Sequence, residues 1–394
     1  MSKDFQKINS GISLTPKSGT PSSPSNGDIY YNSGTGLFQF RQDGTWVAIA
    51  AGGGMTNPMT TTGDVIYSSD NSGTPARLAI GTEGATLQTQ DGIPTWISGT
   101  GSGTALFAGG TNLIASTMYN TIDYFNTATV GNATDFGDLT VARAGVAGCG
   151  DSTRGVFAGN SYSISTIIDY VTIAIAGNAT DFGDLTVARG WLAAFSNNTY
   201  GLFSGGYDGG TLDTIDYVTI ATAGNATDFG DLTLARYYTA GCANTTRGLT
   251  WAGILSGHAK DVIDYVTIAS AGNATDFGNI PVALYRVAAS SSHTRALIFG
   301  GSQQNGLEVN TISYVTIATT GDATDFGDLT VARFDSAATS NKVRAFIGAG
   351  FDGGSIVNTI DYVTIASAGN ATDFGDLTVA RNSLAATSSS HGGI

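Results

Sequence analysis

The feature that most constrains the fold is a phrase that the chain repeats six times. It reads GNATDFGDLTVAR at residues 131–143, and close copies begin at residues 177, 224, 272, 321 and 369. A catalytic loop is needed once in a domain, whereas a phrase repeated at nearly fixed spacing indicates a repeating architecture in which each unit packs on its neighbours. We therefore expect function to lie where the copies differ.

Each repeat is predicted to contain four short β-strands. Val, Thr, Gly and Asn are abundant in the repeats, while Lys, Glu and Leu are sparse, which favours strands and tight turns over helix. Four strands in a unit of this length are typical of one blade of a β-propeller. In the second unit the expected strands, named a, b, c and d, are residues 144–150, 154–159, 166–174 and 182–189.

The two ends of the repeat region complement each other. The first unit begins at residue 104 with a strand b, and the chain finishes with a further strand a at residues 383–389. Closing a ring with this last strand would remove the unpaired edges of an open array. The sequence thus predicts an all-β, six-bladed β-propeller over residues 104–394, with blade 1 completed by residues 383–389.

Glycines and aromatic residues recur at fixed places in the units. A Gly pair often ends strand b, as at Gly109 and Gly110, a Tyr follows in strand c, and a Phe follows in strand d. This order resembles the kelch type of propeller, with Phe where kelch repeats usually place Trp. The resemblance implies a fold and says little about function, because propellers include both enzymes and binding proteins.

An Asp near the start of strand c and an Arg at the end of strand d also recur. Because the turn lies midway between them, we expect them to face each other within one blade as cross-strand ion pairs, worth about 0.2–1 kcal/mol each. The alternative is a ring of arginines that bind a ligand. The expected pairs are Asp123 with Arg143, Asp169 with Arg189, Asp216 with Arg236, and Asp361 with Arg381, and the pattern breaks where Asp264 would face Leu284 and Ser313 would face Arg333.

The connections between strands divide into constant and variable sets. The c–d turn, GNATD, is nearly invariant, and its Asn is expected to stabilise the turn by bonding its own backbone. The b–c loops and d–a junctions vary, and antiparallel order places both on one face of the disc. Aromatic residues there suit recognition, although some could instead pack between blades. The predicted recognition residues are Tyr119, Tyr162, Trp191, Tyr207, Tyr237, Tyr238, Tyr285, Phe334 and Phe351.

The first hundred residues have a different texture. Residues 1–52 are predicted to hold a small β-meander, and residues 53–103 a linker with a short β-module. The phrases GDIYYNSGTGLFQFRQDGTWV and GDVIYSSDNSGTPARLAIGTEGATLQTQDGIPTW resemble segments of tail-fibre and related fibre proteins of tailed bacteriophages. This resemblance implies a virion protein made in the host cytoplasm, commonly a homotrimer. It would attach to other virion proteins through its N-terminal region and contact a host receptor, either a glycan or a surface protein, through its C-terminal head.

Composition argues against several other classes of protein. The net charge of −14 disfavours nucleic acid as a partner, no apolar run approaches 18 residues, so no membrane insertion is expected, and MSKDFQKINSG lacks the apolar core of a signal peptide. The three His residues lack metal-ligand spacing, so we expect no metal and no cofactor. Cys149 and Cys242 occupy equivalent places in two repeats and are interpreted as small buried residues.

These observations favour a binding protein over an enzyme. One alternative is a structural head fibre or decoration protein without a host ligand. Another is a glycan depolymerase, which would use two carboxylates about 5–10 Å apart. Candidate carboxylates on the variable face are Asp208, Asp213, Asp261, Glu308, Asp335 and Asp352.

Overall fold

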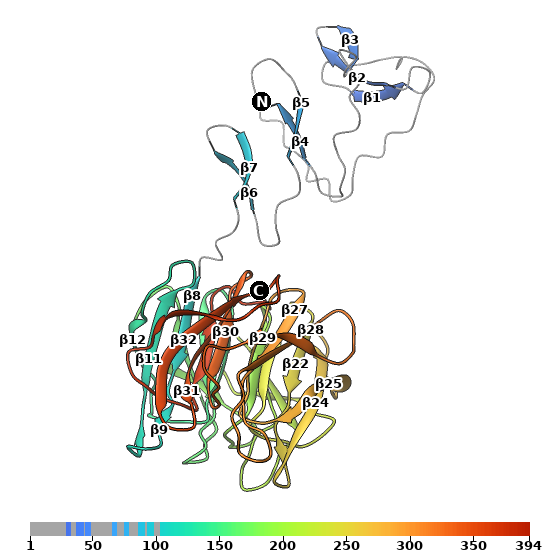
Figure 1. Ribbon diagram of the computed structural model, residues 1–394. Helices are drawn as coiled ribbons and strands as arrows, with labels where there is room; N and C mark the ends of the chain where they lie inside the picture. The colour runs from blue at the N-terminus through green and yellow to red at the C-terminus, as the bar shows by residue number, and fades with distance from the viewer. Residues whose placement is uncertain are drawn as a thin grey trace. The chain divides into compact units, whose positions relative to one another are not determined.

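The chain divides into two compact units in a computed structural model (Figure 1). The structure describes residues 29–32, 37–42, 44–48, 65–68, 75–78, 86–90, 93–97 and 103–394. Every regular element in these residues is a β-strand. No helix among them has the length and apolar character needed to cross a membrane.

The described part of the N-terminal region consists of short antiparallel pairings. Strands β1 (Ile29–Asn32), β2 (Leu37–Gln42) and β3 (Thr45–Ala48) form a three-stranded sheet where the sequence predicts a meander. Two hairpins follow, β4 (Val65–Ser68) with β5 (Pro75–Leu78), and β6 (Thr86–Gln90) with β7 (Ile93–Ile97). Much of the segments predicted at 1–52 and 53–103 lies outside the described residues, so these boundaries stay predictions.

Residues 103–394 form a ring of six antiparallel blades, which confirms the predicted six-bladed β-propeller (Figure 1). Blades 2 and 3 comprise β13 (Ala147–Gly150), β14 (Arg154–Ala158), β15 (Ile167–Thr172) and β16 (Thr180–Asp184), then β17 (Ala193–Ser196), β18 (Tyr200–Ser204), β19 (Thr214–Thr219) and β20 (Thr227–Asp231). Blade 4 comprises β21 (Ala240–Ala243), β22 (Arg247–Trp251), β24 (His258–Thr267) and β25 (Thr275–Leu284), with the short β23 (Ile254–Leu255) beside β24. Blades 5 and 6 comprise β26 (Ala288–Ser291), β27 (Arg295–Phe299), β28 (Thr311–Thr316) and β29 (Thr324–Asp328), then β30 (Ala337–Ser340), β31 (Arg344–Phe351), β32 (Ile356–Thr364) and β33 (Thr372–Asp376).

The last strand of the chain closes the ring. Blade 1 has the order β12 (Thr134–Asp138), β11 (Thr121–Asn126), β8 (Thr104–Ala108) and β34 (Ala385–Ser388), so its innermost strand comes from the C-terminal end. Ala385 pairs with Ala108, and Ser388 pairs with Ala105. The strand predicted at residues 383–389 therefore completes blade 1 as expected. The b–c loop of this blade carries a further hairpin, β9 (Thr111–Asn112) with β10 (Thr117–Met118).

Strand d is shorter than the sequence predicts. In blade 2 it runs from Thr180 to Asp184, and the following residues Leu-Thr-Val-Ala-Arg leave the sheet. Their alternating pattern resembles a strand, but the Leu is buried and the Thr and Arg bond to the next blade. Only in blade 4, where the phrase reads NIPVAL, does strand d continue to Leu284.

The core lies within and between the blades. In every blade the Tyr of strand c packs edge-on against the Phe of strand d, with ring centroids 5.6–5.9 Å apart. The Gly pair after strand b has a backbone reason, because Gly109 and Gly110 adopt φ of +66° and +105°. Cys149 and Cys242 are both buried and unpaired, as interpreted from the sequence.

The C-terminal tail lies across one end of the ring axis. His391 Nε2 is 2.9 Å from the Gly150 carbonyl oxygen at the end of β13, and 3.3 Å from Ser196 Oγ at the end of β17. Burial lowers the pKa of the His391 imidazole, and the bond to Gly150 and the charge of Asp151 oppose that shift. This end of the axis is therefore occupied by the chain itself.

Candidate functional site

The repeated phrase joins neighbouring blades through its turn. We call the contact between two successive blades a seam. In the seam between blades 1 and 2, the side-chain oxygen of Asn178 accepts a 3.0 Å hydrogen bond from the backbone N–H of Asp138. The other five seams repeat this contact, with Asp322 in place of Asn in blade 5. The prediction that this Asn bonds its own backbone is wrong, because its oxygen reaches across the seam.

Five of the six seams also contain a clamp of Thr, Asp and Arg, in which the Asp and Arg side chains are buried. Between blades 1 and 2, Arg143 Nη2 lies 3.0 Å from Asp169 Oδ2, with both side chains 0% exposed. The Thr140 hydroxyl donates a 2.7 Å hydrogen bond to the same carboxylate. The equivalent ion pairs, at 2.8–3.1 Å, are Arg189–Asp216, Arg236–Asp264, Arg333–Asp361 and Arg381–Asp123.

These ion pairs join different blades, whereas the sequence predicts pairs within one blade. Within blade 2, Asp169 is opposite Asp181, after a register shift, and strand d ends at Asp184, well before Arg189. Each Arg therefore reaches the Asp of the following blade. The prediction is corrected for Asp123 with Arg143, Asp169 with Arg189, Asp216 with Arg236, and Asp361 with Arg381.

In the clamp between blades 1 and 2, burial affects the pKa of the guanidinium more strongly than the attraction of the carboxylate does. Desolvation lowers the pKa of the Arg143 guanidinium, and the Asp169 carboxylate opposes that shift. A charge left unpaired in such a place costs several kcal/mol, so the clamp strongly penalises a misaligned seam. The 0% exposure of these side chains also argues against the alternative of ligand-binding arginines.

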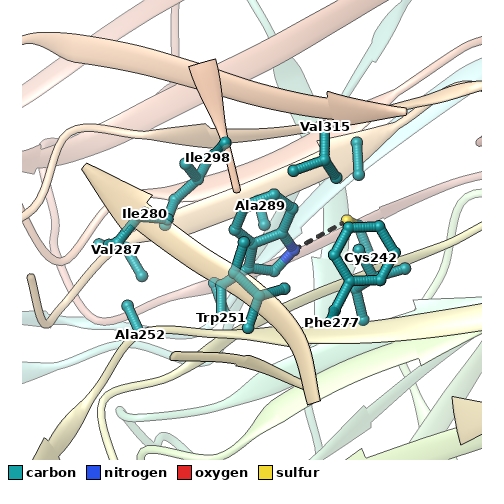
Figure 2. Close-up of a cluster of buried hydrophobic side chains, with 14 of the residues drawn as sticks. Cys242, Trp251, Ala252, Phe277, Ile280, Val287, Ala289, Ile298 and Val315 are labelled. Atoms are coloured by element: carbon teal, nitrogen blue, oxygen red, sulfur yellow. Dashed lines mark hydrogen bonds between the residues drawn. The ribbon is translucent and has the colours of Figure 1, made fainter. Parts of the chain in front are cut away.

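The seam between blades 4 and 5 replaces the clamp with apolar packing. Pro281, Leu284 and Ser313 stand where the other seams have Thr, Arg and Asp. Trp251 is fully buried there among Ile280, Val287 and Ile298 (Figure 2). Its indole N–H donates a 3.4 Å hydrogen bond to Cys242 Sγ. A mainly apolar cavity of about 120 Å³ remains beside Leu284 and Ser313.

Because the repeated phrase is engaged in the seams, a site must be sought on the variable face. The b–c loops and d–a junctions do meet on one face, as expected. Gly190 and Tyr207 exchange backbone hydrogen bonds of 3.1 and 2.9 Å, and Phe334 and Phe351 do the same. Each d–a junction is thus fixed to the b–c loop of the blade that it enters.

Six equivalent junction residues surround the axis on this face in a closed ring of backbone hydrogen bonds. Each backbone N–H donates to the carbonyl oxygen of the equivalent residue in the preceding blade, at 2.8–3.1 Å. All six have φ between +54° and +66°. The residues are Gly145, Trp191, Tyr238, Arg286, Asp335 and Ser383.

The left-handed conformation makes this axial ring informative. It suits glycine, and a residue with a side chain typically loses about 1–2 kcal/mol there. Gly145 shows that glycine completes the ring, yet Trp191, Tyr238 and Arg286 occupy equivalent positions. Strain of this kind concentrates at functional sites, so these bulky side chains mark the axis as the candidate site.

An aromatic surface extends outward from the axial ring over blades 3 and 4. The ring centroids of Trp191 and Tyr238 are 4.7 Å apart, and those of Tyr237 and Tyr207 are 4.9 Å apart. Tyr237 also lies 4.9 Å from Tyr238, and Tyr285 lies 6.1 Å from Tyr238. These five predicted residues form one half-buried cluster.

Arg286 connects this cluster to a second aromatic pair. Its guanidinium lies 4.5 Å from the Tyr238 ring centroid and 5.1 Å from that of Phe334, which packs against Phe351 at 5.3 Å. Arg286 Nη2 also donates a 3.0 Å hydrogen bond to the Tyr238 hydroxyl. Burial raises the pKa of the Tyr238 phenol to about 12, so this hydroxyl stays protonated near neutral pH. The aromatic surface therefore extends from Tyr207 to Phe351, with the Arg286 guanidinium joining its two groups of rings.

The two remaining predicted residues lie outside the cluster. Tyr119 is half-buried, and its backbone N–H bonds to the Gly110 carbonyl. Tyr162 is 54% exposed in the b–c loop of blade 2. Its phenol pKa is raised, mainly by partial burial and also by the charge of Asp335.

Two features of this face go beyond the predicted recognition set. Arg286 sits in the axial ring, and so does Asp335, which the sequence predicts only as a candidate carboxylate of the variable face, since nothing in the sequence marks either as a left-handed position. Exposed aliphatic residues also gather on the b–c loops of blades 1 and 2. They are Leu113, Ile114, Met118 and Ile164.

The fold and this face define the class of the chain as a six-bladed β-propeller that presents a continuous aromatic surface around its axis. In the described part of the chain, no group of three or more His, Cys, Asp or Glu residues is arranged to hold a metal ion. No protein-family model matches the sequence, and a search of curated proteins found no match.

Proposed function

We propose that this chain is a bacteriophage fibre protein with a kelch-like propeller head that recognises the surface of the host cell. The N-terminal region attaches it to other virion proteins, and the assembled fibre is a homotrimer. The head acts by binding, not by catalysis, through the aromatic surface around the axis. Several heads on one particle add weak contacts into firm attachment.

The observation that carries this proposal is that the constant and the variable segments of the propeller lie in different places. The near-invariant phrase is used in the seams, while the variable connections converge on one face and bring seven predicted aromatic residues into one surface. Aromatic rings supply a large contact area at low entropic cost. The phage-like phrases of the N-terminal region supply the link to a virion.

The test is binding of the fluorescently labelled full-length chain to a panel of bacterial strains that tailed phages infect. We expect retention on particular strains. Trp191→Gly combined with Tyr237→Ala should reduce it at least about tenfold, the loss expected when a central aromatic anchor is removed. Glycine is chosen at position 191 because φ there is +54°.

Ile175→Ala is the matched control, because Ile175 is an exposed apolar residue in the c–d turn of blade 2, on the other face. It should bind as the wild type does. Retention on no strain, or equal retention of the double variant, would contradict recognition by this face. Release of soluble oligosaccharides during incubation would instead indicate a depolymerase.

A further inference from the structure

A cavity of about 60 Å³ opens at the centre of the axial ring. Its polar and aromatic lining comes from Trp191, Tyr238, Thr239, Arg286 and Asp335, and the rest of the lining consists of small residues such as Gly145 and Ser383 and the aliphatic residues Val146, Leu192, Val287 and Leu384. It therefore combines two aromatic side chains with a guanidinium, a carboxylate and a hydroxyl. The six blades contribute different side chains at equivalent positions, so the cavity is asymmetric although the scaffold is nearly sixfold.

The cavity offers paired opposite charges. Arg286 Nη1 and Asp335 Oδ2 are 3.7 Å apart, too far for a short hydrogen bond. Asp335 also accepts a 3.4 Å hydrogen bond from Asn382 Nδ2. Because the two charges offset each other, neither a cation nor an anion is favoured. A neutral ligand whose hydroxyl groups both donate and accept hydrogen bonds fits this pair.

Two buried polar groups at this cavity have no partner in the folded chain. The Thr239 hydroxyl is unpaired, and the residue is only 7% exposed. Arg286 Nε–H is likewise unpaired. Such groups are costly to leave unsatisfied and are rare in folded proteins. Both atoms are closed off from solvent, so a bound hydroxyl group would pair with them once side-chain rotation turns them toward the cavity.

The aromatic side chains favour one kind of hydroxylated ligand. Trp191 and Tyr238 stand at strained left-handed positions where Gly145 shows that glycine suffices. An indole or phenol face packs well against the C–H face of a sugar ring while the ring's hydroxyls point to polar neighbours. A small polyol without a ring would use the polar groups but not these faces.

We infer that the axial cavity is a subsite for a single pyranose residue of a neutral saccharide. Trp191 contacts its C–H face, with Tyr238 packed behind Trp191 and Arg286, and Arg286, Asp335 and Thr239 bond its hydroxyls. This inference rests on the proposed function and deepens it, because it assigns glycan, and not protein, as the ligand at the centre of the recognition face.

The probes are methyl glycosides of neutral hexoses, 6-deoxyhexoses and N-acetylhexosamines at millimolar concentration. Binding to the full chain is measured by saturation-transfer NMR and by tryptophan fluorescence. We expect one or a few of these glycosides to bind. Trp191→Gly should abolish binding, and Thr239→Val should weaken it roughly tenfold, the loss expected for one hydrogen bond.

Two controls separate chemistry from folding. Thr239→Ser keeps the hydroxyl and should retain affinity close to that of the wild type, while Ile175→Ala alters the other face of the disc and should leave glycoside binding unchanged. If no glycoside binds, or if Thr239→Val and Trp191→Gly bind like the wild type, the inference is wrong.

Failure of the inference can be told apart from failure of the proposed function. Retention of the chain on cells without any glycoside binding would remove the pyranose subsite, and recognition by this face would stand. Glycoside binding with no retention on any strain would leave the sugar subsite in place and remove host recognition.

Discussion

The seam between blades 4 and 5 differs from the other five in a coordinated way. Five seams contain a complete clamp of Thr, Asp and Arg, with a buried ion pair, and this one has lost all three members together. Leu284 stands at the Arg position of the phrase, and it belongs to the same apolar cluster as Trp251, which Figure 2 shows. The chain thus contains the complete clamp or an apolar replacement, and no seam with an unpaired half.

The difference between the apolar seam and the other five indicates what the clamp contributes. Replacing a buried ion pair by well-packed apolar residues is often neutral, whereas removing one partner leaves an uncompensated charge. The apolar seam shows that two blades can pack without the ion pair. The clamp therefore acts mainly on alignment, since it penalises any arrangement of blades that separates Arg from Asp.

The largest expected effect comes from breaking one clamp by half. Arg189→Leu leaves Asp216 buried without its cation, and we expect a loss of about 3–5 kcal/mol in the free energy of unfolding. Adding Asp216→Ser and Thr186→Pro reproduces the apolar seam and should recover part of that loss, even without a residue equivalent to Trp251.

Urea denaturation of the single and combined variants measures this coupling directly. Asp216→Ser alone serves as the reciprocal control and should also be strongly destabilising. If Arg189→Leu alone costs less than about 1 kcal/mol, the clamp has no role in alignment.

A smaller effect is expected at the outer latch, which all six seams retain. Asn178→Ala removes one side-chain acceptor and should cost about 1 kcal/mol. Asn178→Asp keeps the acceptor, as Asp322 does naturally, and should be nearly neutral. Asp322→Ala in the apolar seam should cost as much as Asn178→Ala, which would show that latch and clamp act independently. A clearly larger cost at Asp322 would mean that the apolar seam depends on its latch.

The smallest effect is expected at the axis and should depend on pH. Burial lowers the pKa of His391 below its ordinary 6.5, so the unfolded chain binds more protons in the window below that value. Stability contributed by neutral His391 is present above about pH 6.5 and is lost as pH falls toward the folded-state pKa. Asp151 and His293 are the titratable groups near it. The unfolding temperature of His391→Gln should change less between pH 5 and 8 than that of the wild type. Identical pH profiles would show that His391 is not a source of the pH dependence.

The ring could be predicted from the sequence because it depends only on the number and order of the predicted strands. Six phrases, a strand b without a strand a at residue 104, and a strand a without a strand b near residue 385 leave few other topologies. The side of the disc on which each connection lies follows from antiparallel order. None of this requires knowledge of individual side-chain contacts.

The seams and the axis could not be predicted in the same way. Asp169 and Arg189 are symmetric about the turn in sequence, but the register shift at Asp169 and the early end of strand d send Arg189 to the next blade. The matched replacement of Arg by Leu284 and of Asp by Ser313 therefore reads in the sequence as two separate defects in two blades. The axial ring could not be predicted, because Trp191, Tyr238 and Arg286 are not residue types that indicate a left-handed backbone.

The closing strand sets the order of events during synthesis. Strand β34 leaves the ribosome after every other strand of the ring, so the inner edge of β8 has no partner until β34 is synthesised. During that interval the nascent chain presents an open strand edge able to pair with another chain. If several copies of the chain assemble side by side, each ring must therefore close before its open β8 edge meets the edge of a neighbouring copy.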